Sequence, residues 1–372
     1  MVPPVIVYYV SGHGYGHAIR AREVMGALWD LMPDCVIEVR TSAPDRLFPQ
    51  DERLRLGRVE VDAGMSESAD SLRIDAAGTV ELIEALLRQR PALVEQEAAF
   101  LGRCRASLVV SDIPYLAGDI AAAAGLECVG ISNFTWNWIV EPFLAGKPEV
   151  LRQIEQGYSR MGALLQLPFG HREGLGMFGH VEPMPLLSGK RTMSRDEVRR
   201  KLGAGDRPVV WVALRGAQSA DMFATAAKGA PEYLFLTTDE SLNGVASNVQ
   251  TIHLGGELWV CDLVAGCDVV LGKLGYGLVS DCVSFKTPLL HVPRTGFRED
   301  AITAREAPRY TVVQELAADP FLNGNWRPGL DAILAKTTPV EVHPKGGAEA
   351  CAEALINSLL HPPKASRVRQ TL

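Results

Sequence analysis

The chain has 372 residues, of which 47% are hydrophobic and 22% are charged, and its formal net charge is −7. This composition is that of an ordinary globular protein, and the length suits two packed domains better than one. The negative net charge argues against nucleic acid as the main partner, and no apolar run is long enough to span a bilayer. An anionic ligand must therefore be met by a local group of positive charges.

The seven cysteines are scattered along the chain, and no two of them have the C-x-x-C spacing. Most stand in apolar surroundings, as Cys128 does beside Val129, which is typical of reduced cysteines in a protein core. We therefore expect a cytoplasmic protein without a zinc or other metal site.

The first motif is a strand followed by a loop that is rich in glycine and histidine. The run Val5–Val10 predicts a central parallel strand, and apolar residues at helical spacing predict a helix over residues 18–29. Gly-x-Gly in the loop between them is half of a dinucleotide fingerprint, but a histidine stands where its third glycine belongs, which disfavours a dehydrogenase. Imidazole titrates near neutral pH, so His13 or His17 is a candidate catalytic base; the alternative is a histidine that caps the helix.

A carboxylate follows a second buried strand of the first half. Residues 35–44 predict another strand and a turn, and residues 79–104 predict a helix that breaks near Pro91. Ser107–Pro114 predicts a buried strand with Asp112 at its carboxyl end. Such a carboxylate can orient a histidine for proton abstraction, whereas the alternative is an aspartate that caps a helix or turn.

An aromatic segment follows a helix that we expect over residues 115–124. The run Leu126–Phe143 predicts a strand and then a loop with Asn133 and Trp136. Aromatic rings stack on sugars and amides bind hydroxyls, so this loop is a candidate binding site for a hydroxylated ligand. Two alternatives remain open, a packed plug between the domains and, if the segment is exposed, peripheral contact with a lipid or membrane surface.

The second half begins after a region rich in glycine and proline. Residues 146–165 predict a helix, and Pro168–Lys190 predicts the interdomain linker. Ser194–Gly203 carries a capping-box pattern and a terminal glycine, which predict a short helix. Buried strands are expected within residues 208–223, 233–239 and 248–254.

The segment Gly266–Asp300 has the strongest functional pattern. It predicts a strand over residues 268–271, a glycine loop over 272–277, a helix over 278–285 and a strand over 289–292. Backbone N–H groups and a helix N-terminus attract an anion, and Lys273 adds a positive charge. Asp281, expected in the first turn of the helix, can bind a sugar hydroxyl. These residues predict a phosphate and ribose site; the alternative is an ordinary strand-to-helix turn.

The same segment, GKLGYGLVSDCVSFKTPLLHVPR from Gly272, resembles the donor-binding half of nucleotide-sugar glycosyltransferases of the GT-B architecture. More specifically, it resembles the glycosyltransferase-like N-terminal region of the plant L-arabinokinases. Four further blocks carry this resemblance in order: SGHGYGHAIR at Ser11, SLVVSDI at Ser107, ISNFTWNW at Ile131 and GNWRPGL at Gly324.

The resemblance implies an α/β fold of two Rossmann-like, doubly wound domains that face each other across a cleft. Residues 1–180 then form the acceptor domain and residues 190–346 the donor domain, and a C-terminal helix, 347–361, packs back on the first. We expect a free-standing form of the arabinokinase region.

The resemblance also implies roles for individual residues. The base falls on His17, with His13 in reserve, and Asp112 orients it. The acceptor is expected at Gly14, Tyr15, Gly16, Asn133 and Trp136. The donor is expected at Arg215, Gly216, Trp259, Lys273, Gly275, Tyr276, Gly277, Asp281, Arg294, Glu299 and Asp300.

Two of these positions depart from the pattern of related enzymes. Arg215–Gly216 replaces a pair of glycines that contact the donor phosphates, and an arginine there can either bridge the diphosphate or block its approach. Asp281 replaces a glutamate, which is one methylene longer.

The sequence therefore predicts an inverting glycosyltransferase that moves a sugar from a nucleotide-sugar donor, with a UDP-sugar favoured, to an unidentified acceptor hydroxyl. No D-x-D motif occurs, and we expect neither a metal ion nor a cofactor. Two alternatives stay open: a non-catalytic sugar-nucleotide-binding protein, and a sugar-nucleotide 2-epimerase on the same fold.

Overall fold

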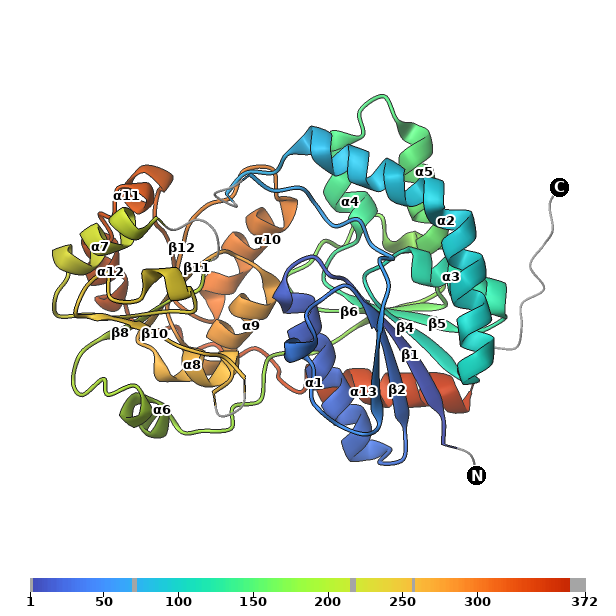
Figure 1. Ribbon diagram of the computed structural model, residues 1–372, viewed down its shortest axis with the longest axis horizontal. Helices are drawn as coiled ribbons and strands as arrows, with labels where there is room; N and C mark the ends of the chain where they lie inside the picture. The colour runs from blue at the N-terminus through green and yellow to red at the C-terminus, as the bar shows by residue number, and fades with distance from the viewer. Residues whose placement is uncertain (1–2, 69–71, 215–218, 256–257, 362–372) are drawn as a thin grey trace.

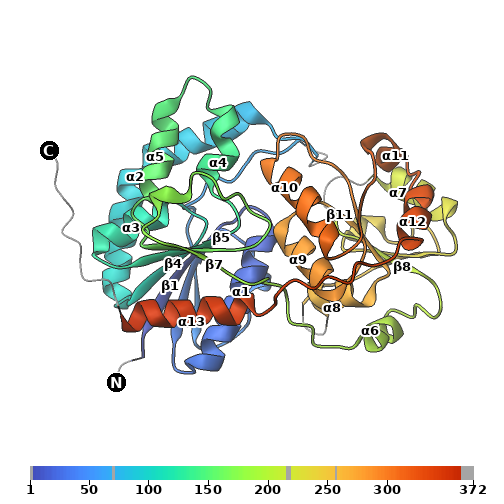
Figure 2. The same ribbon diagram turned by 180° about the vertical axis from the view of Figure 1, so that it is seen from behind.

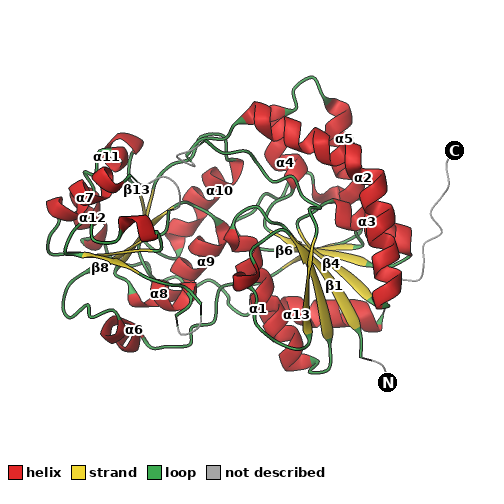
Figure 3. Ribbon diagram, in the orientation of Figure 1, coloured by secondary structure: helices red, strands yellow, loops and turns green. Residues whose placement is uncertain are grey.

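The computed structural model describes residues 3–68, 72–214, 219–255 and 258–361, and it contains two parallel β-sheets that lie side by side (Figure 1). Alternate side chains of the central strands enter hydrophobic clusters on opposite faces of the sheet. In β1 (Val5–Val10), Ile6 and Tyr8 pack on one face and Val7 on the other. Both faces are covered by helices (Figure 3). This is why central strands such as β1 are almost continuously apolar in sequence.

The first sheet has seven strands in the order β3-β2-β1-β4-β5-β6-β7. The order reverses between β1 and β4, and the register there places Val10 opposite Asp112. Residues 146–165, expected as one helix, instead contain a shorter helix and strand β6, and strand β7 lies within the expected linker. The strands after β1 are β2 (Val36–Thr41), β3 (Leu54–Arg58), β4 (Leu108–Asp112), β5 (Cys128–Ser132), β6 (Ala163–Gln166) and β7 (Val181–Pro183).

The helices of this half differ from the expected ones mainly at their ends. The first helix begins at Tyr15 rather than at residue 18, and Gly14 caps it with φ 77°, a conformation that favours glycine. The long helix continues through Pro91 without the expected break, since packing against its neighbours outweighs the lost hydrogen bond. The helices are α1 (Tyr15–Leu31), α2 (Ala76–Cys104), α3 (Leu116–Ala124), α4 (Trp136–Val140) and α5 (Pro148–Tyr158), with 3-10 turns at Asp45–Leu47, Glu141–Phe143 and Leu175–Met177.

The second sheet has six strands in the order β10-β9-β8-β11-β12-β13, and its order reverses between β8 and β11. Helix α9 begins at Tyr276, two residues earlier than expected. The strands are β8 (Val209–Val212), β9 (Leu234–Thr237), β10 (Val249–Thr251), β11 (Val269–Gly272), β12 (Leu289–His291) and β13 (Val313–Glu315). The helices are α6 (Arg195–Lys201), α7 (Ala220–Gly229), α8 (Val260–Gly266), α9 (Tyr276–Phe285), α10 (Arg298–Glu306), α11 (Ala318–Leu322) and α12 (Arg327–Leu334), with 3-10 turns at Glu240–Leu242 and Ala307–Arg309.

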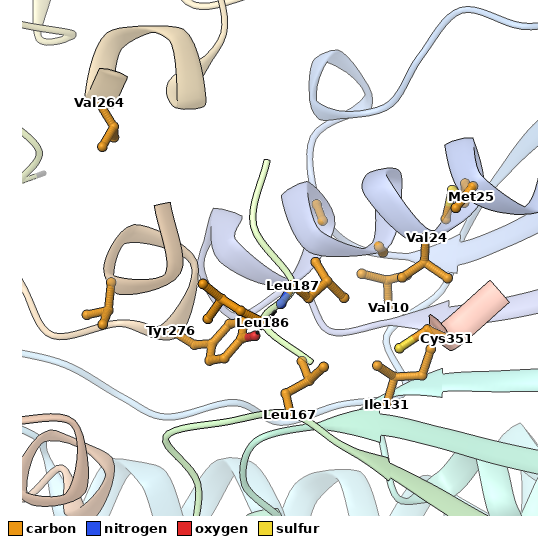
Figure 4. Packing of buried hydrophobic residues seen from close by; sticks show 14 of the residues in the cluster. Val10, Val24, Met25, Ile131, Leu167, Leu186, Leu187, Val264, Tyr276 and Cys351 are labelled. Carbon is orange, nitrogen blue, oxygen red and sulfur yellow. Dashed lines mark hydrogen bonds between the residues drawn. The ribbon is translucent and has the colours of Figure 1, made fainter. Parts of the chain in front are cut away.

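The last helix joins the two halves. Helix α13 (Gly347–Leu360) packs against α1, beneath the strands of the first sheet (Figure 2). Next to it, Leu186 and Leu187 of the linker and Tyr276 of α9 belong to one continuous hydrophobic cluster with residues of the first sheet (Figure 4). A buried core therefore holds the two sheets in one arrangement. None of the described helices is both long and apolar enough to cross a membrane.

Candidate active site

The candidate active site lies where the carboxyl ends of the two sheets face each other. In open parallel sheets, ligands bind beyond the carboxyl ends of the strands, at the point where the strand order reverses. Helices α1 and α9 start at these points, and their first turns approach each other: a Cβ added to Gly277 would lie 3.6 Å from Cα of Gly16. Two helix N-termini thus point into the same region.

His17 and Asp112 form a buried pair at the carboxyl ends of β1 and β4. His17 Nδ1 lies 2.8 Å from Asp112 Oδ1, as expected from the parallel register of the two strands. Burial opposes ionisation of Asp112, but Arg20 and His17 outweigh it and lower the pKa of the carboxyl. The carboxylate can therefore hold the proton of His17 on Nδ1, which leaves Nε2 as the base.

His13 lies beside this pair but is held by other groups. Its Nδ1 accepts a hydrogen bond from the backbone N–H of Met65 at 3.3 Å, and its ring packs edge-on against Trp136. Burial and the neighbouring His17 lower the pKa of His13 to about 4. His13 is therefore neutral near pH 7, and its contacts indicate that it lines the site as a packed side chain.

Arg20 is a site residue that the sequence analysis missed. Its side chain is 4% exposed, its Nε donates to Asp112 Oδ2 at 2.6 Å, and its Nη2 donates to Asp112 Oδ1. It stands three residues after His17, so both side chains lie on the same face of α1. That spacing is the sequence signal that could have found it.

The glycine loop before α9 carries the expected positive charge. Gly275 is the N-cap of α9 without a side-chain cap, so the N–H groups of this turn are available to an anion. Lys273 Nζ lies 3.4 Å from a carboxylate oxygen of Glu67, which belongs to the segment between β3 and α2. Burial lowers the pKa of Lys273, and Glu67 opposes this shift. Glu67 was not found from the sequence.

The acidic pair at the start of α10 is buried and bonded. Arg294 donates to both oxygens of Asp300, and its Nη2 lies 3.9 Å from Glu299 Oε2. Glu299 Oε1 accepts from the amide of Asn133 at 2.7 Å, a contact between the two halves. Burial raises the pKa of Glu299 to about 7, although Arg294 opposes the shift.

Three expected donor residues lie against other groups. Asp281 is in the second turn of α9, because the helix starts at Tyr276, and its Oδ1 accepts from the backbone N–H of linker residue Gly189 at 2.7 Å. Its expected place in the first turn is therefore wrong. The guanidinium of Arg22 lies over the ring of Trp259, 4.1 Å from its centroid. Tyr276 is buried, and its hydroxyl accepts from the N–H of Leu187 at 3.1 Å.

The environment of Asp281 predicts a pH-dependent stability. Burial raises its pKa from 3.8 to about 7. The folded chain then holds a proton that the unfolded chain releases above pH 4, so stability falls as pH rises from about 4 to about 7. We expect Asp281→Asn to keep the bond to Gly189 and to stabilise the protein at pH 8 by up to about 4 kcal/mol, since one pKa unit is about 1.4 kcal/mol. Urea unfolding at pH 5 and pH 8 measures this, and equal stability changes at both values would contradict it.

Asp262 of α8 offers a matched control. It is also buried against the linker, but its two oxygens accept from the N–H groups of Thr192, Met193 and Trp259 and from the hydroxyl of Thr192. An asparagine cannot accept all of these bonds, so Asp262→Asn is expected to destabilise the protein at pH 8.

The expected acceptor residues line the first half of the site. Asn133 is 1% exposed, and its Oδ1 accepts from Arg20 at 3.0 Å. Trp136 and Asp62 line a small cavity together with Tyr115, whose hydroxyl finds no hydrogen-bond partner among the described residues. Gly14, Tyr15 and Gly16 form the cap and the first turn of α1, and the Tyr15 hydroxyl accepts from Arg46.

Two of the predicted residues, Arg215 and Gly216, lie outside the described residues. Within the described ranges, no group of three or more His, Cys, Asp or Glu side chains is arranged to hold a metal ion.

A family model for glycosyl transferase family 1 matches residues 5–315 of the chain, which include both sheets. The chain belongs to this family. It is also 31% identical over 339 residues, 89% of its length, to the L-arabinokinase of Arabidopsis thaliana. The chain spans 32% of the length of that relative.

Solved glycosyltransferase structures share the fold of this family member. The calicheamicin glycosyltransferase has a TM-score of 0.58 and 16% identity, with 97% of this chain and 95% of that chain covered. A UDP-glucosyltransferase from Polygonum tinctorium has a TM-score of 0.56 and 15% identity, with 96% and 93% covered. UGT89C1 of Arabidopsis thaliana, complexed with UDP-L-rhamnose, has a TM-score of 0.55 and 13% identity, with 96% and 95% covered.

These findings confirm the predicted fold and the predicted enzyme class. The fold is GT-B, with two Rossmann-like sheets, and the class is that of the glycosyltransferases.

Proposed function

We propose that this chain transfers a sugar from a nucleotide-sugar donor to an acceptor hydroxyl, with inversion and without a metal ion. The observation that carries the proposal is the buried pair His17–Asp112, with 2.8 Å between Nδ1 and Oδ1, opposite the N-terminus of α9. One side of the site thus offers a base, and the other offers a binding place for a diphosphate.

In the proposed reaction, His17 Nε2 takes the proton of the acceptor hydroxyl. The hydroxyl oxygen forms a bond to the anomeric carbon of the donor sugar, while the bond from that carbon to the diphosphate oxygen breaks. A single displacement of this kind inverts the configuration at the anomeric carbon. Asp112 holds the tautomer of His17 and stabilises the imidazolium that forms.

The leaving diphosphate carries negative charge that must be stabilised. The N–H groups of the first turn of α9, the dipole of this helix and Lys273 supply fixed positive charge at this place. A preformed cradle of this kind does the electrostatic work that a metal ion does in other transferases. Glu299 and Asp300 are assigned to hydroxyls of the donor sugar.

A UDP-sugar is the favoured donor. Among the structures of similar fold, one is described as a complex with UDP, another with UDP-L-rhamnose and a third with dTDP. The acceptor is assigned to the first half, beside Trp136 and its polar cavity. The arabinokinase relative extends well beyond the length of this chain, so its kinase activity is not part of the proposal.

Two variants of opposite effect test the donor site. Lys273→Ala removes a charge-assisted contact to the diphosphate, so UDP is expected to bind about 10- to 100-fold more weakly. Glu67→Gln removes the carboxylate that lies 3.4 Å from Lys273, so UDP is expected to bind several-fold more tightly, by about 1 kcal/mol. Isothermal titration calorimetry with UDP measures both. Equal affinities in all three proteins, or a weaker affinity in Glu67→Gln, would place the diphosphate elsewhere.

A further inference from the structure

A buried polar chain crosses from the first half of the molecule to the second. It starts at His17 and Asp112, continues through Arg20 of α1 to Asn133 after β5, and ends at Glu299 of α10. The two links beyond Arg20 measure 3.0 Å from Arg20 Nη1 to Asn133 Oδ1 and 2.7 Å from Asn133 Nδ2 to Glu299 Oε1. All five residues are at most 9% exposed.

Arg20 fixes the direction of its own bonds in this chain and of the bond from Asn133 to Glu299. A guanidinium only donates, so it holds Asp112 as an acceptor on both oxygens and turns the carbonyl oxygen of the Asn133 amide toward itself. The amide nitrogen of Asn133 must then point away, and it donates to Glu299. The Arg20 side chain therefore sets the orientation of Asp112 beside His17 and, through Asn133, the contact to Glu299.

The planar fork of Arg20 is required for this arrangement. Its Nε and Nη2 bind the two oxygens of Asp112 while its Nη1 reaches Asn133. A lysine keeps the charge, but its single nitrogen cannot hold two groups in one plane.

We propose that Arg20 is a positioning residue, whose guanidinium sets the His17–Asp112 base relative to Glu299 across the two halves. The proposal rests on the transfer reaction proposed above. Arg20 itself does not touch the reacting atoms: its Nη2 lies 3.0 Å from Nδ1 of His17, the ring nitrogen that does not take the acceptor proton, and it also holds Asp112. Through Asn133 it acts on the carboxylate assigned to the donor sugar.

A kinetic comparison of Arg20 with a second, largely buried arginine tests this role. Arg40 of β2 binds Glu97 of α2 with the same fork and is 12% exposed, but it lies outside the site. Arg20→Lys is expected to lower kcat about 100-fold, because a small displacement of a catalytic group costs a rate of this order. KM for the donor is expected to change less than about 3-fold. Arg40→Lys is expected to change neither constant. An Arg20→Lys enzyme with the kcat of Arg40→Lys overturns the proposal.

A spectroscopic readout separates this proposal from the proposed reaction, because it needs no turnover. The imidazole ¹⁵N signals of His17, assigned with His17→Ala, are recorded in the wild type and in Glu299→Gln. When Arg20 is present, Glu299→Gln is expected to shift the ¹⁵N signals of His17. In an Arg20→Lys background, Glu299→Gln is expected to leave these signals unchanged. Equal displacement in both backgrounds overturns the positioning role. If the ¹⁵N shift depends on Arg20 but the protein transfers no sugar, the positioning role is supported and the proposed transfer reaction is refuted.

Discussion

Replacing His17 by alanine is expected to lower the rate of sugar transfer about 10²- to 10⁴-fold, which is the usual contribution of a general base. Its Nδ1 is held by Asp112 at 2.8 Å, so Nε2 is the group left to take the acceptor proton. The donor contacts proposed here come from the second half of the molecule, so the affinity for UDP is expected to stay within about 3-fold of the wild type.

His13→Ala is the matched control for this prediction. His13 is a second histidine on the same loop, but its Nδ1 already accepts from Met65 and burial lowers its pKa to about 4. Single-turnover release of nucleoside diphosphate in the three proteins makes the comparison. Normal rates in His17→Ala together with a large loss in His13→Ala would move the base to His13.

Replacing Asp112 by alanine is expected to destabilise the fold by about 3 to 5 kcal/mol, the usual effect of leaving one buried charge without its partner. Asp112 is fully buried, and both of its oxygens accept from Arg20, which is itself 4% exposed. The variant is also expected to lose transfer activity, because His17 loses the group that orients it. Denaturant unfolding measures the first effect.

A double variant separates the two effects of Asp112. Arg20→Met in the Asp112→Ala background removes the orphaned charge, so most of the lost stability is expected to return while activity stays low. A double variant that is no more stable than Asp112→Ala would show that Arg20 is not the cause of the destabilisation. Recovered activity in the double variant would contradict the role of Asp112 in orienting the base.

The strands and the His17–Asp112 pair were predictable from local sequence. Continuous apolar runs marked β1 and β4, and parallel pairing then brings the residues after one strand beside the end of the other, which is why His17 meets Asp112. The glycines of the loop before α9 likewise predicted a helix N-terminus there. These features depend on periodicity and on residues close in the chain.

The contacts between segments far apart in the chain were not predictable. Glu67 reaches Lys273 from a segment without hydrophobic periodicity, and Asn133 meets Glu299 only because the two halves pack together. Asp281 was misplaced because Gly275, rather than Gly277, caps α9, and this shift turns its carboxylate toward the linker. Strand β7 was missed because it is three residues long and lies in a region rich in glycine and proline.

The most direct test of sugar transfer is to incubate the chain with a UDP-sugar that carries a ¹³C-labelled sugar and with a small-molecule extract, and to search the products by mass spectrometry. With the wild type, products heavier by one labelled sugar and release of UDP are expected, and with His17→Ala both are expected to fall about 10²- to 10⁴-fold. Binding of UDP-sugars without any labelled product would instead indicate a sugar-nucleotide-binding protein. Solvent deuterium entering the sugar at C2 of the donor, again without transfer, would indicate an epimerase and contradict the account.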